Sequence, residues 1–244
     1  MGLQPDVTAG VILVIALAVL VGALVQSVVG LGVGLVSAPI IALVEPGLMP
    51  GLPLWFGLAV STMSLVSERA HVDWRAAAWV LPPRLPGTVV GVWLVTAFTA
   101  DQLGVVLALV VLGAVLLSVR TVVVPQTPTT LVAAGFTSGV TGSSTSIGGP
   151  PLALVFQHRP PAEARSTMGV FFVFGSALSL LGLGVTDSLP RDALLVALMV
   201  LPALGVGFWA GARLRAWLPR ERFRHAVLAV CAVSAVVLIV RSVA

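Results

Sequence analysis

The chain is organised around one stretch, GVTGSSTSIGGPP at residues 139–151, which interrupts an apolar segment. Four consecutive hydroxyl residues at 143–146 come just before Gly148, Gly149 and two prolines. Glycine and proline destabilise a continuous α-helix, so we expect the helix to break at residues 143–146. Backbone left unpaired at membrane depth is tolerated only where it is buried in protein or lines a polar cavity. The stretch therefore predicts a broken helix beside a site for a polar solute.

A weaker copy of this pattern, VVGLGVGLVSAP, lies upstream at residues 28–39. It has three spaced glycines ahead of a proline, as the later stretch has. A shift of about 112 residues aligns its first valine, first glycine and proline with later counterparts: Val28, Gly30 and Pro39 with Val140, Gly142 and Pro151. We interpret the two stretches as two halves of one site.

The composition places the chain among polytopic membrane proteins. Its 244 residues are 58% hydrophobic and only 9% charged, with a mean hydropathy of +1.12. In soluble domains about a quarter of the residues are charged. The first apolar run, 7–29, is long enough to span a bilayer.

Charge and cysteine content exclude several classes of function. The net charge of +4 does not indicate nucleic-acid binding, because the basic residues are scattered among apolar segments rather than clustered with aromatic residues. Cys231 is the only cysteine, so disulfides and thiolate metal sites within one chain are excluded. Hydrolase, zinc and P-loop motifs do not occur in the sequence, and we therefore expect no catalytic residues, no metal, no cofactor and no enzyme.

Apolar segments and a central linker divide the chain into two halves, at residues 1–122 and 129–244, joined by 123–128. The predicted segments are 7–29, 35–44, 54–66, 76–98 and 103–119 in the first half, and 131–142, 147–156, 167–185, 193–212 and 225–240 in the second. Residues 131–142 and 147–156 each cover about half of a bilayer core of roughly 30 Å, which suits a re-entrant hairpin.

The repeat is clearest outside the two breaks. A shift of 105 aligns a second-half segment with residues 59–63, including Ser61 and Thr62 with Ser166 and Thr167. A shift of 116 aligns eight residues of the first half with eight of the second: Arg75, Ala77, Val80, Leu85, Pro86, Val90, Gly91 and Trp93 with Arg191, Ala193, Val196, Leu201, Pro202, Val206, Gly207 and Trp209. Because arginine, proline and tryptophan coincide, chance similarity between apolar segments is the weaker explanation.

The arginines predict that the two halves are inverted. Cytoplasmic loops are rich in basic residues, and the basic loops fall on one side only if the segment that contains residues 143–146 enters and leaves from that side. We therefore expect an all-α polytopic membrane protein with two inverted-topology repeats and both termini outside. Each repeat is a broken, re-entrant helix hairpin followed by three transmembrane helices, as in many secondary transporters.

The candidate substrate-binding residues lie mainly at the two breaks. Backbone N–H groups at a broken helix end, together with hydroxyls, can hold a small anion. At the first break, tight helix packing is an equally good explanation for the small residues, and Ser61 and Thr62 could also bond within a helix interface. The candidates are Gln26, Ser27, Gly30, Ser37 and Thr62 in the first half and Thr141, Ser143, Ser144, Thr145, Ser146, Gly148 and Gly149 in the second.

Arg84 is a further candidate, because it lies about nine residues inside the fourth segment, near 13 Å deep at helical rise. A charge at that depth is costly and usually faces a cavity or a partner. Arg84 could balance an anionic substrate, or its side chain could extend to the membrane interface. Its counterpart at a shift of 116 is Val200, so the charge is not part of the repeated scaffold.

Several short motifs, in this order and spacing, resemble the sulfite exporter TauE/SafE family. They are the two Gly/Pro breaks, the stretch Val72-Asp73-Trp74-Arg75 before a Gly-rich span, and Gly148-Gly149-Pro150-Pro151. The resemblance covers nearly the whole chain. It implies a bacterial-type plasma-membrane transporter with two inverted halves that moves sulfite, sulfoacetate or other sulfur-containing organic anions.

We therefore expect a multi-pass permease of the cell membrane that carries a small anion by alternating access around a midplane site. The expected partners are the anion and the lipid bilayer, and no nucleic acid. A coupling ion, H+ or Na+, and a homo-oligomer are left open. The alternatives are a membrane-embedded accessory or scaffold subunit and a non-transport membrane enzyme.

Overall fold

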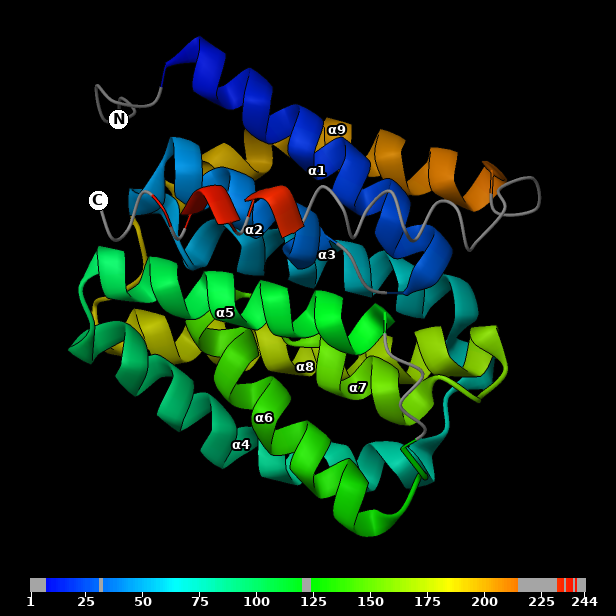
Figure 1. Ribbon diagram of the computed structural model, residues 1–244. Coiled ribbons are helices and arrows are strands. Elements are labelled where there is room, and N and C mark those ends of the chain that lie inside the picture. Colours follow the sequence, from blue (N-terminus) through cyan, green and yellow to red (C-terminus); the bar gives the residue numbers. More distant parts are fainter. Residues whose placement is uncertain are drawn as a thin grey trace.

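The computed structural model describes residues 8–30, 33–119 and 124–214, together with 232–234, 236–238 and 240. The regular elements in the long ranges are helical, with short 3-10 turns at Pro46–Leu48 and Arg69–His71. The α-helices are α1 Ala9–Val29, α2 Val33–Val44, α3 Gly51–Glu68, α4 Trp74–Ala97, α5 Ala100–Val119, α6 Pro128–Thr145, α7 Gly149–Phe156, α8 Pro161–Val185 and α9 Ala193–Leu214 (Figure 1). The helical class expected from the sequence is confirmed.

Four of these helices are long and apolar enough to cross a membrane: Ala9–Val28, Trp74–Ala97, Pro161–Val185 and Ala193–Leu214. They correspond to four of the segments predicted from the sequence. The last predicted span, 225–240, lies largely outside the described residues. The chain is thus a multi-pass membrane protein, as its composition predicts.

Local sequence explains where several helices begin. The side chain of Thr8 accepts a hydrogen bond from the Val11 N–H at the start of α1, and Asp73 accepts one from the Ala76 N–H at the start of α4. Thr127 and Thr130 form a reciprocal capping box at the start of α6. Such caps satisfy N–H groups that have no partner inside the helix.

Helix α4 continues through Pro82, Pro83 and Pro86, although proline usually interrupts an α-helix. Neighbouring helices can compensate for the hydrogen bonds that proline removes from a membrane helix. The backbone of α6 lies directly against this region, because a Cβ added to Gly135 would lie 2.3 Å from the Val80 carbonyl oxygen. Close packing on α6 therefore accompanies the proline-rich part of α4.

Two helix pairs are in close contact through glycine. On α4, a Cβ at Gly91 would lie 2.6 Å from the carbonyl oxygen of Val140 in α6. On α9, a Cβ at Gly207 would lie 2.2 Å from the carbonyl oxygen of Leu20 in α1. In each pair, residues nearer the C-terminus of one helix contact residues nearer the C-terminus of the other. The two helices of each pair therefore run parallel. Small residues allow such approach between membrane helices.

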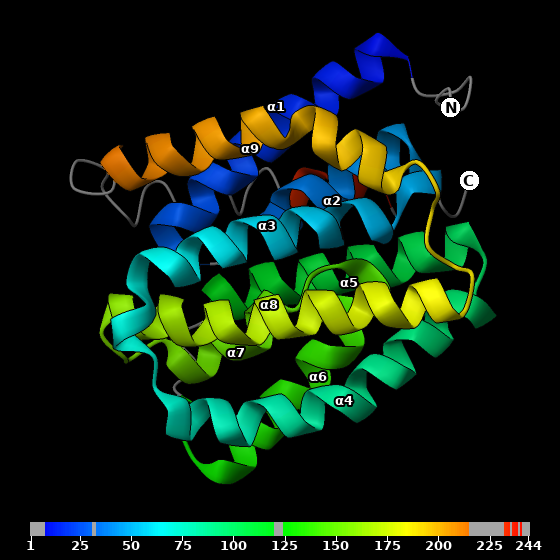
Figure 2. The same ribbon diagram turned by 180° about the vertical axis from the view of Figure 1, so that it is seen from behind.

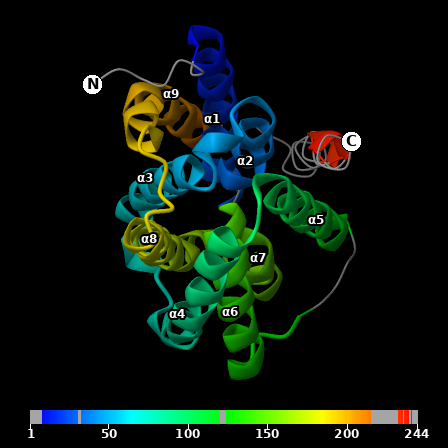
Figure 3. The same ribbon diagram turned by 90° about the vertical axis from the view of Figure 1, so that its left-hand side faces the viewer.

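Helices α3 and α8 lie between these two pairs in the end-on view of Figure 3, and they run side by side in Figure 2. They are antiparallel, because the end of α3 and the start of α8 are joined by an ion pair. Arg165 donates from Nε and Nη2 to the two carboxylate oxygens of Glu68, at 2.9 and 2.6 Å. The Thr167 hydroxyl also accepts from the Asp73 N–H at 2.9 Å.

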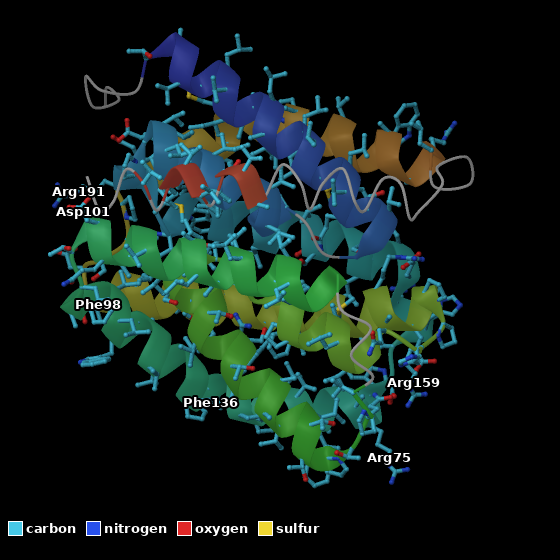
Figure 4. All side chains as sticks on the ribbon, in the orientation of Figure 1. Arg75, Phe98, Asp101, Phe136, Arg159 and Arg191 are labelled. Carbon is cyan, nitrogen blue, oxygen red and sulfur yellow. The ribbon has the colours of Figure 1, made fainter. Side chains whose placement is uncertain are left out.

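The molecule has two opposite ends. Figure 4 shows Arg75 and Arg159 at one end, here called the Arg159 end, and Asp101 and Arg191 at the other, the Arg191 end. At the Arg191 end, the α2–α3 and α8–α9 connections line an open pocket of about 420 Å³. It is lined by Glu45, Gly47, Leu48, Met49, Asp187, Ser188, Leu189, Pro190, Arg191 and Asp192.

The second helix break lies later than the sequence predicted. Helix α6 continues through Ser143 and Ser144 and ends at Thr145, and the next residue, Ser146, has a left-handed φ of 63°. The predicted break was wrong for residues 143–145, because their hydroxyls do not disrupt the helix. The Ser144 and Thr145 hydroxyls donate to carbonyl oxygens one turn earlier, at 2.8 and 2.7 Å.

The first break has the same form, with a different spacing from the one expected. Helix α1 ends at Val29, the next residue, Gly30, also has a left-handed φ, of 92°, and α2 begins at Val33. The left-handed residues, at 30 and 146, and the following helix starts, at 33 and 149, are each 116 positions apart. The breaks therefore follow the shift of the Arg75 and Arg191 regions, and the shift of about 112 is wrong.

Candidate functional site

The two helix breaks meet inside the molecule. A Cβ added to Gly34 at the start of α2 would lie 2.4 Å from the Ser146 carbonyl oxygen, so only glycine allows this approach. The Ser146 hydroxyl donates to the Pro50 carbonyl oxygen at 2.7 Å, which ties the second break to the chain that follows α2. The pairing of the two stretches into one region, expected from the sequence, is observed.

A cavity of about 50 Å³ lies where the breaks meet. Its volume suits a few water molecules or one small ion. It is lined from both breaks and from α3, α4 and α8, by Gln26, Val33, Gly34, Leu35, Pro53, Leu54, Gly57, Ser61, Arg84, Gly142, Ser146, Ile147, Gly148, Gly149, Pro150, Phe172 and Ser176.

Gln26 holds the first break together. Its Nε2 donates to the Gly30 carbonyl oxygen at 3.0 Å, and its Oε1 accepts from the Val33 N–H at 3.3 Å. One buried amide thereby satisfies backbone groups on both sides of the interruption. An unsatisfied backbone group would cost free energy at this depth.

Ser138 has the corresponding role at the second break. Its hydroxyl donates to the Gly148 carbonyl oxygen, and its own carbonyl oxygen accepts from Arg84 Nη1 at 3.1 Å. Gly148 precedes α7 and supplies no side-chain cap. The first N–H groups of a helix have no partner within it and carry a partial positive charge, so the start of α7 favours an anion.

Arg84 brings a full positive charge to this place. Its side chain is only 2% exposed, and its guanidinium carbon lies 4.5 Å from the centre of the Phe171 ring. Nε has no hydrogen-bond partner. The ion pairs among the described residues use Arg159 and Arg165, so Arg84 has no acidic partner within the described part of the chain. A buried cation of this kind is costly without a counter-charge.

The structure brings only part of the predicted binding set to the cavity: Gln26, Arg84, Ser146, Gly148 and Gly149 line it. Six of the other predicted hydroxyl residues form hydrogen bonds elsewhere. Ser143 bonds to Ser179 at 2.7 Å, and Ser37, Thr62, Thr141, Ser144 and Thr145 each donate to a carbonyl oxygen one turn earlier in their own helix.

Ser27 and Gly30 also lie outside the lining. The Ser27 hydroxyl is buried without a partner and faces α9, because a Cβ at Gly211 would lie 2.8 Å from it. Gly30 forms the left-handed corner after α1 and lies against the aliphatic part of Arg165, whose Cγ a Cβ would approach to 2.6 Å. Both residues pack the first break rather than the cavity.

The sequence pointed to α3 through the Ser61–Thr62 pair, of which Ser61 rather than the candidate Thr62 lines the cavity, and it missed the contribution of α8. Ser176, Gly57 and Phe172 also line it and had no signal in the sequence. These residues lie on regular helices, where nothing in a single sequence distinguishes a cavity-facing serine from a packed one.

Comparisons with known proteins agree with this picture of a membrane protein. The family model described as "Sulfite exporter TauE/SafE" matches residues 14–238. A curated relative from Cupriavidus necator, named "Probable sulfite/organosulfonate exporter TauE", is 28% identical over 205 residues, which are 79% of each chain. No solved structure matches the chain.

Proposed function

The chain belongs to the sulfite exporter TauE/SafE family, and we propose that it is a secondary transporter of small sulfur-containing anions, sulfite or organosulfonates, in the cell membrane. The name of the relative from Cupriavidus necator suggests this substrate class. The observation that supports it most strongly is Arg84, a buried cation in a cavity to which no described residue brings a negative charge. A bound anion would supply the missing counter-charge.

Backbone groups would complete the anion site. Gly149 is the first residue of α7, and the two prolines after it have no N–H, so the anion would meet a few amides beside a guanidinium. Gln26 also lines the cavity and has a second N–H besides the one that it donates to Gly30, whereas the hydroxyl proton of Ser146 is already donated to Pro50. Guanidinium and helix N-termini are common partners of oxyanions.

The lengths of the broken arms support a site at membrane depth. Helix α2 has 12 residues and runs from its break to the Arg191 end, and α7 has 8 residues and runs from its break to the Arg159 end. At 1.5 Å per residue the two arms measure about 18 and 12 Å, which together equal a hydrocarbon core of about 30 Å. We infer that the solute is held within the bilayer.

We further propose that residues 1–122 and 129–244 are inverted repeats. The hairpin of α1 and α2 opens toward the Arg191 end and that of α6 and α7 toward the Arg159 end, and the break positions are 116 residues apart. Each parallel helix pair also joins one helix of the first half to one of the second, since α4 packs on α6 and α1 on α9. Such halves can rock around a fixed site to give alternating access.

Anion flux into proteoliposomes tests the role of Arg84. We expect Arg84→Gln to lower sulfite affinity by about tenfold or more, because a charge-assisted bond contributes about 1.5 to 3 kcal/mol. Arg213→Gln is the matched control, because Arg213 at the end of α9 is exposed and stacks on Trp209. It should bind and transport like the wild type.

Flux should be measured with sulfite and an organosulfonate, and with imposed H+ and Na+ gradients. Equal sulfite affinity in Arg84→Gln and the wild type, in protein of unchanged melting temperature, would rule out an anion site at Arg84. An accessory subunit would show no flux above empty liposomes in any variant.

A further inference from the structure

Two buried arginines of this protein differ in which guanidinium nitrogens form hydrogen bonds. Arg165 binds Glu68 through Nε and Nη2, each donating to one carboxylate oxygen. Arg84 uses Nη1 alone, toward the Ser138 carbonyl oxygen, and its Nε has no partner. Its Nε–Nη2 edge, the edge with which Arg165 makes a two-point contact, therefore makes no hydrogen bond in the described structure.

Helix α8 covers the flat face of the Arg84 guanidinium. The Phe171 ring lies 4.5 Å from its central carbon. One turn later, a Cβ on Gly175 would lie 2.0 Å from Nε, 2.1 Å from Cζ and 2.4 Å from Nη2. A point beyond the Nε–Nη2 edge would be farther from Cζ than from either nitrogen, so this position lies over the guanidinium plane. A side chain larger than that of glycine would displace the guanidinium.

Helix α6 limits the guanidinium from another direction. A Cβ on Gly142 would lie 3.1 Å from Nη2 and 3.3 Å from Nη1. Phe171 and Gly175 are four residues apart and so share one face of α8. The cation therefore occupies a slot whose walls are helix backbone and an aromatic ring, and whose shape fixes the plane of the guanidinium.

We propose that Phe171 and Gly175 are positioning residues that orient Arg84 so that its Nε–Nη2 edge grips two oxygens of one anion. The inference rests on the proposed function and narrows its substrate class to oxyanions, which sulfite and sulfonates share. A halide ion accepts only at a single point, so the fork favours an oxyanion over chloride of the same charge.

Gly175→Ala tests the slot directly in the full-length protein. The added methyl group displaces the guanidinium, so sulfite affinity, measured by isothermal titration, falls by about tenfold or more while chloride inhibition of flux changes little. Gly184→Ala is the matched control on α8, because a Cβ there meets no atom within 4 Å. Its affinity stays within about twofold of the wild type. Phe171→Leu keeps an apolar side chain without the aromatic face and also weakens binding.

A double-mutant cycle separates positioning from general damage. Gly175→Ala placed on Arg84→Lys costs no further affinity, because lysine has no planar fork to misalign. An equal loss from Gly175→Ala in both backgrounds, or an unchanged sulfite affinity in Gly175→Ala alone, would overturn the inference. If Arg84→Gln itself binds sulfite like the wild type, the proposed anion site fails, and this inference fails with it.

Discussion

At the scale of single residues, the two breaks are chemically different although their backbones correspond. At a shift of 116, the counterpart of Gln26 is Gly142. The side chain of Gln26 bridges the first break, whereas Gly142 leaves room for Arg84, which enters from α4. At the position where the first half has a neutral amide, the second half has a glycine, and this glycine leaves room for the cation. The cation itself, Arg84, belongs to the first half, so the charge of the site comes from only one half.

Gly34 is the residue at which the breaks touch, and Gly34→Ala tests that contact. We expect the variant to lose about 1 to 3 kcal/mol of stability, because its methyl group would overlap the backbone oxygen of Ser146. Thermal melting in detergent measures the loss. Gly113→Ala in α5 is the control, because a Cβ there meets no atom within 4 Å. If the two variants melted alike, the breaks would not be in contact as described.

At the scale of elements, the sequence predicted the helices better than the place where one of them breaks. Apolar runs and proline or glycine boundaries predicted α1 to α7 and α9 within three residues at each end, whereas α8 begins six residues before the predicted segment. The run of hydroxyl residues led to a wrong prediction of the break. A serine or threonine hydroxyl can bond to a carbonyl of its own helix and leave the helix intact, and composition does not show whether it does so. For the same reason, most of the predicted hydroxyls are not at the cavity, while Arg84 and the Gly148–Gly149 pair are.

Helices α3 and α8 are joined at the Arg159 end by Glu68 and Arg165, and the link can be tested by Glu68→Gln. Arg165 is only 7% exposed, so the loss of its carboxylate partner should destabilise the protein by about 2 to 3 kcal/mol. The measurement is the melting temperature of the purified protein. Reversing both charges, with Glu68→Arg and Arg165→Glu, should restore part of the loss.

Asp73→Asn provides the matched control for this pair. Asp73 lies 3.7 Å from the half-exposed Arg159, and the amide keeps an oxygen to cap α4. A change of no more than about 0.5 kcal/mol is expected, since exposed pairs contribute little. A loss as large as that of Glu68→Gln would show that charge at this end, rather than the buried pair, stabilises the contact.

At the scale of the whole molecule, the arginines separate the two ends. Arg69, Arg75 and Arg159 lie at the Arg159 end, and α9 also runs toward it and ends just after Arg213 (Figures 1 and 4). The Arg191 end has Arg191 together with Glu45, Asp101, Asp187 and Asp192. The basic end of a membrane protein faces the cytoplasm.

Cysteine labelling in cells tests this orientation. In a Cys231→Ser background, we expect Gly47→Cys at the Arg191 end to react with a membrane-impermeant maleimide added to intact cells. His158→Cys at the Arg159 end should react only after the membrane is permeabilised. Both positions are exposed, so a difference in burial does not explain the result. Labelling of both from outside would contradict the orientation.

The unequal arms of the two hairpins have a consequence for energy. Since α7 is shorter than α2, an anion held between the breaks as proposed would lie about 12 Å from the Arg159 end, the expected cytoplasmic end, of a layer about 30 Å thick. On entering from the cytoplasm it would have crossed about two-fifths of the membrane voltage, which amounts to about 0.9 kcal/mol per charge at 100 mV. With the cell interior negative, this electrical work favours loading from the cytoplasm. The resting polarisation of the cell would thus drive export before any other gradient contributes.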